Sequence, residues 1–160
     1  MITTQIIDDV QLAAAALQEG LLVAFPTETV YGLGADATNP LAVQRLFVGK
    51  SRPSDNPLIV HLGHVDRLPH AARFVPDSAK KLLERFSPGP MTVVVEKHPG
   101  ITDAATAGLN TVGIRIPDHP QATKLLRLAS RPIAAPSANL SGRPSCTTWQ
   151  SVAEDLEGKV

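Results

Sequence analysis

Residues 21–34 decide the predicted fold, and they read Leu21-Leu22-Val23-Ala24-Phe25-Pro26-Thr27-Glu28-Thr29-Val30-Tyr31-Gly32-Leu33-Gly34. The apolar run at the start has the length of a strand and is closed by Pro26. A run that is apolar on both faces suits a central strand that is covered on both sides. The polar, glycine-containing stretch after it would lie at the carboxyl end of this strand, where open α/β folds bind ligands.

Helices and strands mix along the rest of the chain without a strict βαβ repeat. Helical periodicity and capping residues predict helices over residues 9–19, 40–49, 76–86, 119–128 and 147–156. The last of these helices opens with a capping box formed by Thr147 and Gln150. Apolar runs predict strands over residues 58–62, 91–96, 112–116 and 133–135. We therefore expect an α/β fold, a twisted mixed sheet flanked by helices, in one domain that spans residues 1–160.

Composition limits the classes of function. Lys and Arg together number 15 and so do Asp and Glu, which gives a formal net charge of zero. An electrostatic grip on nucleic acid would therefore need local clusters of basic side chains. Cys146 is the only cysteine, which excludes an internal disulfide framework and fits a reducing cytoplasm. The sequence shows neither a signal peptide nor an apolar run of the roughly 20 residues that cross a bilayer, so we expect a cytoplasmic protein.

The first candidate binding segment is the loop after residue 25. Hydroxyl groups on Thr27, Thr29 and Tyr31 offer hydrogen-bond donors and acceptors, and two glycines allow close approach of a ligand to the backbone. The alternative is a tight turn with capping threonines. Gly32 and Gly34 are not a dinucleotide fingerprint, because no third glycine follows at the required spacing.

The second candidate segment, residues 49–57, combines an ammonium group and a guanidinium group two residues apart. Lys50 and Arg52, with Ser54 and Asn56 as neutral partners, form a candidate phosphate clamp. The alternative interpretation is simpler. Both cations lie near the predicted end of a helix, where the helix dipole favours positive charge in any case.

The third candidate segment, residues 135–145, is rich in serine and proline and follows an apolar strand. It could be an ordinary surface loop, but three such loops in one small domain favour a single shared pocket. Arg115 supports this hypothesis, because a guanidinium within an apolar strand needs an anionic partner or a pocket. His61 also interrupts an apolar strand, although a lone histidine there is often a satisfied core residue.

The sequence predicts no protein-only metal site. The five histidines do not fall at ligand spacing with carboxylates, and they are His61, His64, His70, His98 and His119. A Mg²⁺ ion that is carried by nucleotide phosphates remains compatible with the sequence.

Taken together, four motifs resemble the YrdC/TsaC/Sua family in order along the chain. They are Phe25 to Gly34, Lys50-Ser51-Arg52-Pro53 with Asn56-Pro57-Leu58, Pro88-Gly89-Pro90-Met91-Thr92, and Pro136-Ser137-Ala138-Asn139-Leu140-Ser141-Gly142. The resemblance implies a YrdC-like fold and synthesis of L-threonylcarbamoyladenylate and pyrophosphate from L-threonine, bicarbonate or CO₂, and ATP. This chemistry depends mainly on positioning and charge stabilisation.

The resemblance also implies residue roles. Lys50 and Arg52 would be catalytic and would hold the nucleotide phosphates. The full ATP-binding set would be Lys50, Arg52, Asn56, Thr111, Ser137, Asn139, Arg143 and Ser145. The threonine-binding set would be Thr29, His61, Arg115 and the backbone of Ala135, with Arg115 pairing with the substrate carboxylate. His61 is by position a candidate base for the threonine amine.

The implied partners are ATP with its Mg²⁺, L-threonine, bicarbonate or CO₂, and a transferase that passes the threonylcarbamoyl group to a tRNA adenosine. No membrane partner is expected. Family members continue past residues 157–160 into a further strand, so we expect this C-terminal strand region to be absent from the chain. Its loss would expose a sheet edge.

Two rival functions stay open. One is the YrdC-like domain of hydrogenase-maturation carbamoyltransferases, against which a start methionine just ahead of the first helix argues. The other is an RNA-binding module without catalysis. Zero net charge and a low aromatic content weigh against sequence-specific binding of single-stranded RNA, while leaving room for weak tRNA contact.

Overall fold

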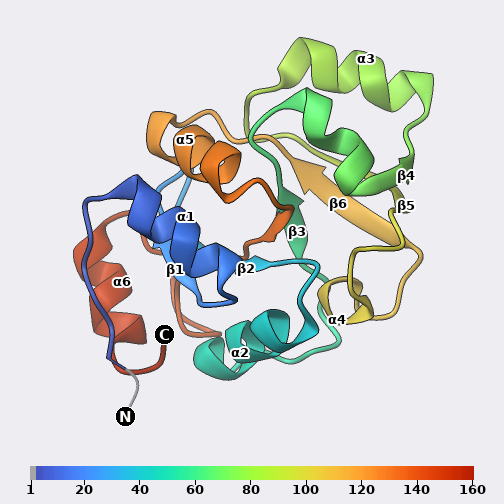
Figure 1. The fold of residues 1–160 in the computed structure, drawn as a ribbon. Coiled ribbons are helices and arrows are strands. Elements are labelled where there is room, and N and C mark those ends of the chain that lie inside the picture. Colours follow the sequence, from blue (N-terminus) through green and yellow to red (C-terminus); the bar gives the residue numbers. More distant parts are fainter. Residues whose placement is uncertain (1–2) are drawn as a thin grey trace.

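A mixed sheet organises residues 3–160, the part of the chain that this computed structural model describes (Figure 1). Its strands are β1 (Val23–Phe25), β2 (Gly32–Asp36), β3 (Ile59–His61), β4 (Ala72–Phe74), β5 (Thr92–Lys97), β6 (Thr111–Arg115) and β7 (Ile133–Ala134). They lie in the order β1-β2-β7-β3-β6-β5-β4. Among these described strands, β3 and β6 pair in parallel and all other neighbours are antiparallel. The expected mixed α/β sheet is confirmed.

Helices cover this sheet from two sides. They are α1 (Val10–Gln18), α2 (Pro40–Lys50), the 3₁₀ helix η1 (Val65–His70), α3 (Asp77–Phe86), α4 (Asp103–Thr106), α5 (Pro120–Ala129) and α6 (Trp149–Leu156). Apolar residues of α1 and α5 form one core cluster with Phe25, Ile133 and Ala135. The larger core cluster lies on the opposite face and includes Ala134 together with residues of α2, α3, α4 and α6. This alternation along β7 is the period of two that a strand between two layers requires.

Capping residues set the starts of α1 and α2, and the cap that the sequence predicts at the start of α1 is confirmed. The Asp9 carboxylate accepts from the Gln11 amide at 2.7 Å, and the Asn39 side chain accepts from the amides of Leu41 and Ala42. The expected capping box at Thr147 is wrong by one residue. Thr148 caps α6 instead, and its hydroxyl accepts from the Ser151 amide at 3.3 Å.

Two expectations about residues 21–34 are corrected. The run at residues 21–25 gives β1, which lies at the edge of the sheet rather than at its centre and pairs with β2. Its apolar character is explained by Phe25, which is buried against α1 and α5. Part of the expected loop is also a strand, since Gly32–Asp36 form the fully buried β2.

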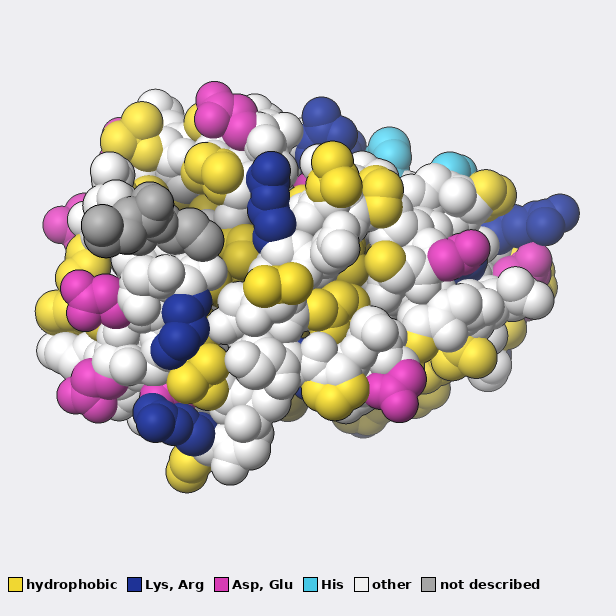
Figure 2. Space-filling view, turned by 90° about the horizontal axis from the view of Figure 1, so that it is seen from below, with side chains coloured by type: hydrophobic (Ala, Val, Ile, Leu, Met, Phe, Trp, Pro, Cys, Tyr) yellow, Lys and Arg dark blue, Asp and Glu magenta, His cyan; other side chains and the backbone are white. Residues whose placement is uncertain are grey.

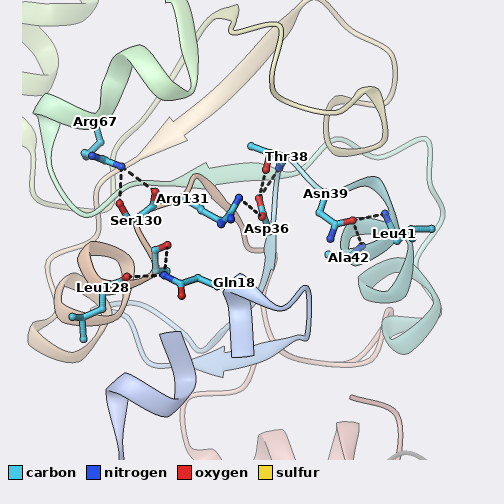
Figure 3. A network of polar contacts seen from close by, with 11 residues as sticks. Gln18, Asp36, Thr38, Asn39, Leu41, Ala42, Arg67, Leu128, Ser130 and Arg131 are labelled. Atoms are coloured by element: carbon cyan, nitrogen blue, oxygen red, sulfur yellow. Dashed lines mark hydrogen bonds and ion pairs between the residues drawn. The ribbon is translucent and has the colours of Figure 1, made fainter. Parts of the chain in front are cut away.

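A network of polar contacts connects the ends of α1 and α5 with η1 and with β2 (Figure 3). The buried carboxylate of Asp36 lies 3.4 Å from the Arg131 guanidinium and also accepts from the Thr38 hydroxyl at 2.6 Å. Nearby, the Gln18 amide donates to carbonyl oxygens at the end of α5 at 3.2 Å, and Arg67 donates to Ser130. These contacts fix α1, α5 and η1 relative to β2.

One half of the sheet face that carries α1 and α5 stays open to solvent. Ile59 of β3, Gly113 of β6 and Val94 of β5 lie side by side in register on this face. Ile59 is 38% exposed and Val94 is 69% exposed. The candidate site described below begins at the border between the covered and the open half.

The two ends of the described chain meet at Thr4 (Figure 1). Its hydroxyl donates to the carbonyl oxygen of Val160 at 2.6 Å and accepts from the Gly158 amide at 2.9 Å. Val160 in turn packs against the larger core cluster.

Candidate active site

A cavity of about 250 Å³ lies beside β3 and β6, the two parallel strands. The β1–β2 loop, residues from both strands and the segment after β7 surround it. The lining residues are Thr27, Val30, Tyr31, Gly32, Arg52, Pro57, Leu58, Ile59, His61, Arg115, Ala135, Pro136 and Ser137. The three polar segments expected to share a pocket therefore contribute to one cavity.

Backbone hydrogen bonds hold two of these segments together. Gly32 bridges to Ser137 as an extension of the sheet, and the amide of Ala138 donates to the carbonyl oxygen of Tyr31 at 2.7 Å. The Tyr31 amide donates to the carbonyl oxygen of Cys146 at 2.8 Å. The β1–β2 loop and the segment after β7 thus form one continuous wall that is joined by backbone hydrogen bonds.

Arg115, at the end of β6, is held by the β1–β2 loop. Its Nη2 donates to Glu28 Oε1 at 2.8 Å and to Thr29 Oγ1 at 3.0 Å, while its Nε is buried without a hydrogen-bond partner among the described residues. Burial raises the pKa of Glu28, but the hydrogen bond and charge of Arg115, together with hydrogen bonds from the backbone of Glu28 and Asp118, outweigh this effect and lower the pKa overall. The guanidinium therefore lines the cavity as a cation, and its Nη2 is held in place by Glu28 and Thr29.

His61, at the end of β3, is buried and neutral. Burial, and then the charge of Arg115, lower its pKa to about 4. Its Nδ1 lies 3.3 Å from the Ile59 carbonyl oxygen, so the proton resides on Nδ1 and Nε2 keeps a lone pair. Phe25 packs edge-on against the ring at 6.3 Å. A group with this pKa accepts hydrogen bonds but is a weak base, which argues against the expected candidate role as base for an amine.

The lowered pKa of His61 predicts a pH dependence of stability. Between pH 4 and 6.5 the unfolded imidazole binds a proton that the folded one does not, with the folded pKa about 4. The stabilisation is complete above pH 6.5 and is lost as pH falls to 4, at a cost of about 3 kcal/mol. His61→Gln should remove this part of the slope in urea unfolding measured across that range.

The matched control is His70→Gln at an exposed position, which removes an imidazole from the surface. Equal pH slopes for the unsubstituted chain and His61→Gln would show that His61 titrates normally in the folded protein.

Lys50 and Arg52 face different surroundings. Lys50 is 1% exposed, and its Nζ donates to the backbone carbonyl oxygens of Ser137 and Asn139. Burial, and then the charge of Arg52, lower its pKa to about 8. Arg52 lines the cavity, and burial lowers the pKa of its guanidinium. The expected phosphate clamp is therefore divided, because Arg52 lines the cavity and Lys50 supports the segment after β7.

Most of the remaining expected nucleotide ligands lie outside the cavity. Asn56, Thr111 and Ser145 are exposed and do not line it. Arg143 is also outside and pairs with Asp155 at 2.6 Å. Asn139 is buried, and its amide nitrogen donates to the carbonyl oxygens of Leu140 and Arg143 at 2.9 Å. Of the expected ATP-binding residues, Arg52 and Ser137 line the cavity itself.

The expected threonine-binding residues gather more closely. His61, Arg115 and Ala135 line the cavity, and Thr29 reaches it through its hydrogen bond to Arg115. Two acidic residues that the sequence analysis did not single out hold parts of the site in place. Glu28 accepts a hydrogen bond from Arg115, and Asp155 accepts one from the Leu140 amide in the segment after β7. Glu28 lies within the first motif. Nothing local marks Asp155, because its partners are 12 and 15 residues away.

A second hollow, of about 530 Å³, lies along α5 and is lined by residues such as Thr123, Lys124 and Leu128. It is larger, but the chemistry favours the cavity beside β3. Only that cavity, among the two, brings together a buried histidine, two guanidinium groups and the ends of parallel strands.

Within residues 3–160, no three His, Cys, Asp or Glu side chains gather closely enough to hold a metal ion. None of the helices there is both long and apolar enough to span a membrane.

This fold and site define a class. Residues 15–160 match the family model described as telomere recombination, that of Sua5, YciO and YrdC, and the chain belongs to this family. Threonylcarbamoyl-AMP synthase of Pyrococcus abyssi is 51% identical over 151 residues, which cover 94% of this chain and 44% of that protein. The Vibrio vulnificus threonylcarbamoyl-AMP synthase is 35% identical over 156 residues, which cover 96% of this chain and 84% of that protein.

A solved structure supports the same assignment. The crystal structure of P. abyssi Sua5 complexed with L-threonine superimposes with a TM-score of 0.93 at 49% identity, over 99% of this chain and 47% of that one. The chain thus spans less than half the length of its P. abyssi relative.

Proposed function

We propose that the chain is a threonylcarbamoyl-AMP synthase, which forms threonylcarbamoyl-AMP and pyrophosphate from L-threonine, bicarbonate or CO₂, and ATP. The observation that carries this proposal is the likeness to P. abyssi Sua5 complexed with L-threonine, combined with a cavity that gathers Arg115, His61 and Thr29. The similar structure suggests L-threonine as the substrate, and the cavity contains a guanidinium and an imidazole that can bind an amino acid.

The cavity fits an amino acid better than a nucleotide. Its volume of about 250 Å³ is below the roughly 300–1,000 Å³ that is usual for drug-sized ligands. Arg115 would bind the threonine carboxylate, and the unprotonated Nε2 of His61 would accept a hydrogen bond from the substrate. Thr29 and the backbone of Ala135 would complete this half of the site.

The nucleotide would then extend from Arg52 and Ser137 onto the open half of the sheet. Ile59 of β3 pairs with Gly113 of β6. Two residues earlier lie Pro57, just before β3, and Thr111, the first residue of β6. This places the expected ligands Asn56 and Thr111 at the same end of the sheet, outside the cavity. Asn139, Arg143 and Ser145 would border the phosphates from the segment after β7, and Lys50 would hold that segment in place.

The proposed reaction needs positioned groups more than a protein nucleophile. The threonine amine attacks the carbon of CO₂ and loses a proton; if bicarbonate is the substrate, that proton leaves with hydroxide as water. An oxygen of the resulting carbamate then attacks the α-phosphorus of ATP. The α–β phosphoanhydride bond breaks and pyrophosphate leaves. Arg52 would stabilise the charge that develops on the phosphates. Mg²⁺ would arrive on the nucleotide and neutralise phosphate charge.

The product is a reactive mixed anhydride, so a transferase must accept the threonylcarbamoyl group, as tRNA modification would require. A cytoplasmic location stays a prediction. Figure 2 shows one face of the molecule, on which basic, acidic and apolar side chains are interspersed rather than sorted by sign. A formal net charge of zero gives the molecule no overall electrostatic attraction to phosphates, which favours the enzyme over the RNA-binding module.

Calorimetric titration tests the proposal. L-threonine and ATP-Mg²⁺ should each bind the chain, and L-serine should bind more weakly because it lacks the methyl group. Pyrophosphate release should then require threonine, bicarbonate and ATP together. Binding of RNA with a steep salt dependence and no binding of threonine or ATP would contradict the proposal.

Arg52→Ala should weaken ATP binding at least tenfold while leaving threonine binding within about twofold, since a charge-assisted hydrogen bond contributes about 1.5–3 kcal/mol. Titration of both ligands measures the two effects. Arg73→Ala is the matched control, because this exposed arginine lies in β4 and pairs with Glu96. Unchanged ATP affinity in Arg52→Ala would remove Arg52 from the nucleotide site.

A further inference from the structure

α6 places a buried carboxylate beneath the segment that follows β7. Asp155 is 7% exposed, and its Oδ2 accepts a hydrogen bond from the Leu140 amide at 3.0 Å. Its Oδ1 accepts from Arg143 Nη1 at 2.6 Å. The hydrogen bond from Arg143 is the main cause of the lowered pKa of Asp155. One side chain thus holds both the backbone and a side chain of residues 137–145, here called the β7–α6 loop.

Lys50 holds the same loop from α2. Its Nζ donates to the carbonyl oxygens of Ser137 and Asn139, and its own carbonyl oxygen accepts from the Ser141 amide at 3.0 Å. Asn139 therefore lies between two fixed points. Lys50 binds the carbonyl oxygen of Asn139, and Asp155 binds the amide of the next residue, Leu140. Its Oδ1 is buried and has no hydrogen-bond partner among the described residues.

We propose that Asp155 is a positioning residue for the nucleotide half of the site, an inference that rests on the proposed function. It does not line the cavity and would act through its partners rather than by touching a substrate. By fixing the Leu140 amide and the Arg143 guanidinium, it sets the course of the loop, and with it the placement of Ser137 and Asn139 toward the phosphates. Preorganised donors bind and stabilise charge better than mobile ones, since less is lost in ordering them.

Because Arg143 is paired with Asp155, we expect it to contribute less to phosphate binding than Arg52 does. Its charge is already partnered by Asp155, so a phosphate gains less from it than from a free guanidinium. Loss of Asp155 should therefore weaken nucleotide binding more than loss of Arg143, because Asp155→Ala also releases the Leu140 amide.

Four variants separate positioning from general stability. Asp155→Ala should raise the ATP dissociation constant about tenfold, and Asp155→Asn about threefold, because asparagine keeps an acceptor for the Leu140 amide. Arg143→Ala should have an effect no larger than that of Asp155→Asn. Threonine affinity should change less than twofold in all of them. Glu154→Gln, at the exposed neighbouring position, is the control and should match the unsubstituted chain.

Amide hydrogen exchange supplies a readout that needs no nucleotide. The Leu140 amide should exchange at least several-fold faster in Asp155→Ala than in the unsubstituted chain, and at the unsubstituted rate in Glu154→Gln. If the unsubstituted chain binds no ATP, the proposed function fails, and this exchange rate alone decides whether Asp155 orders the loop.

Two results would overturn the inference. One is an unchanged exchange rate of Leu140 in Asp155→Ala. The other is an equal loss of ATP and threonine affinity that follows a fall in melting temperature, since a purely structural residue would weaken both half-sites together.

Discussion

Lys50→Met is expected to lower the free energy of unfolding by about 2–4 kcal/mol and to reduce ATP binding below detection. Methionine leaves the part-buried carbonyl oxygen of Ser137 and the buried one of Asn139 without their donor, and an unsatisfied buried group costs about 1–3 kcal/mol. Removal of a buried charge offsets part of this cost. Because these carbonyls belong to the β7–α6 loop, the nucleotide half of the site should lose its shape.

Urea unfolding followed by circular dichroism measures the first effect and calorimetric titration the second. Lys80→Met is the matched control, since Lys80 is exposed and pairs with Asp77 on the surface of α3, which predicts a change below about 1 kcal/mol. An Lys50→Met chain as stable as the Lys80→Met chain would show that Lys50 does not hold the loop.

The lowered pKa of Lys50 also predicts how the free energy of unfolding depends on pH. Its pKa is lowered to about 8 from an ordinary 10.5, so between these values the unfolded chain binds a proton that the folded chain lacks. Stability should therefore rise with pH through this window in the unsubstituted chain relative to Lys50→Met, and the difference should be constant below pH 8.

Arg115→Ala is expected to weaken L-threonine binding about 100-fold, because a carboxylate paired with a buried guanidinium contributes about 2–3 kcal/mol. ATP affinity should change less than about threefold, since Arg115 lies at the end of β6 away from Thr111. The variant also leaves the Glu28 carboxylate without its cation. Glu28→Gln/Arg115→Ala is therefore a useful companion, which removes that unpaired charge.

Titration of both ligands into both variants gives the result. If ATP binding falls and threonine binding does not, the two half-sites are exchanged relative to the proposal. If the double variant recovers threonine binding, repulsion by Glu28 rather than loss of Arg115 causes the defect.

The helices α1, α2, α3, α5 and α6 were predictable because their information is local, whereas η1, α4 and the strand β4 were not expected from the sequence. Asp9 and Asn39 cap α1 and α2 from positions directly before them, and the apolar periodicity follows within one or two turns. β2 escaped prediction since its glycines suggest a turn. In the structure Gly34 serves packing instead, because a Cβ there would lie 2.9 Å from Ile133 Cγ2 and 3.0 Å from Phe25 Cε1. Such contacts between distant segments leave no local pattern.

The sequence could predict those residues of the candidate site that interrupt the apolar pattern of a strand. Arg115 and His61 stand out as polar residues in apolar runs, and both line the cavity. Their partners did not stand out. Glu28 and Arg115 are 87 residues apart, and Lys50 binds carbonyl oxygens, which every residue carries. Composition can therefore indicate where a site lies, but not which groups orient it.

The hydrogen bond between Thr4 and Val160 bears on the order in which the molecule folds. The two residues are 156 positions apart in the sequence, so their contact closes a very long loop. Contacts of that kind must await the closure of a very long loop, which slows their formation. During synthesis on the ribosome, the sheet strands near the amino terminus can pair early. The segment around Thr4, in contrast, stays undocked until residues 158–160 have emerged.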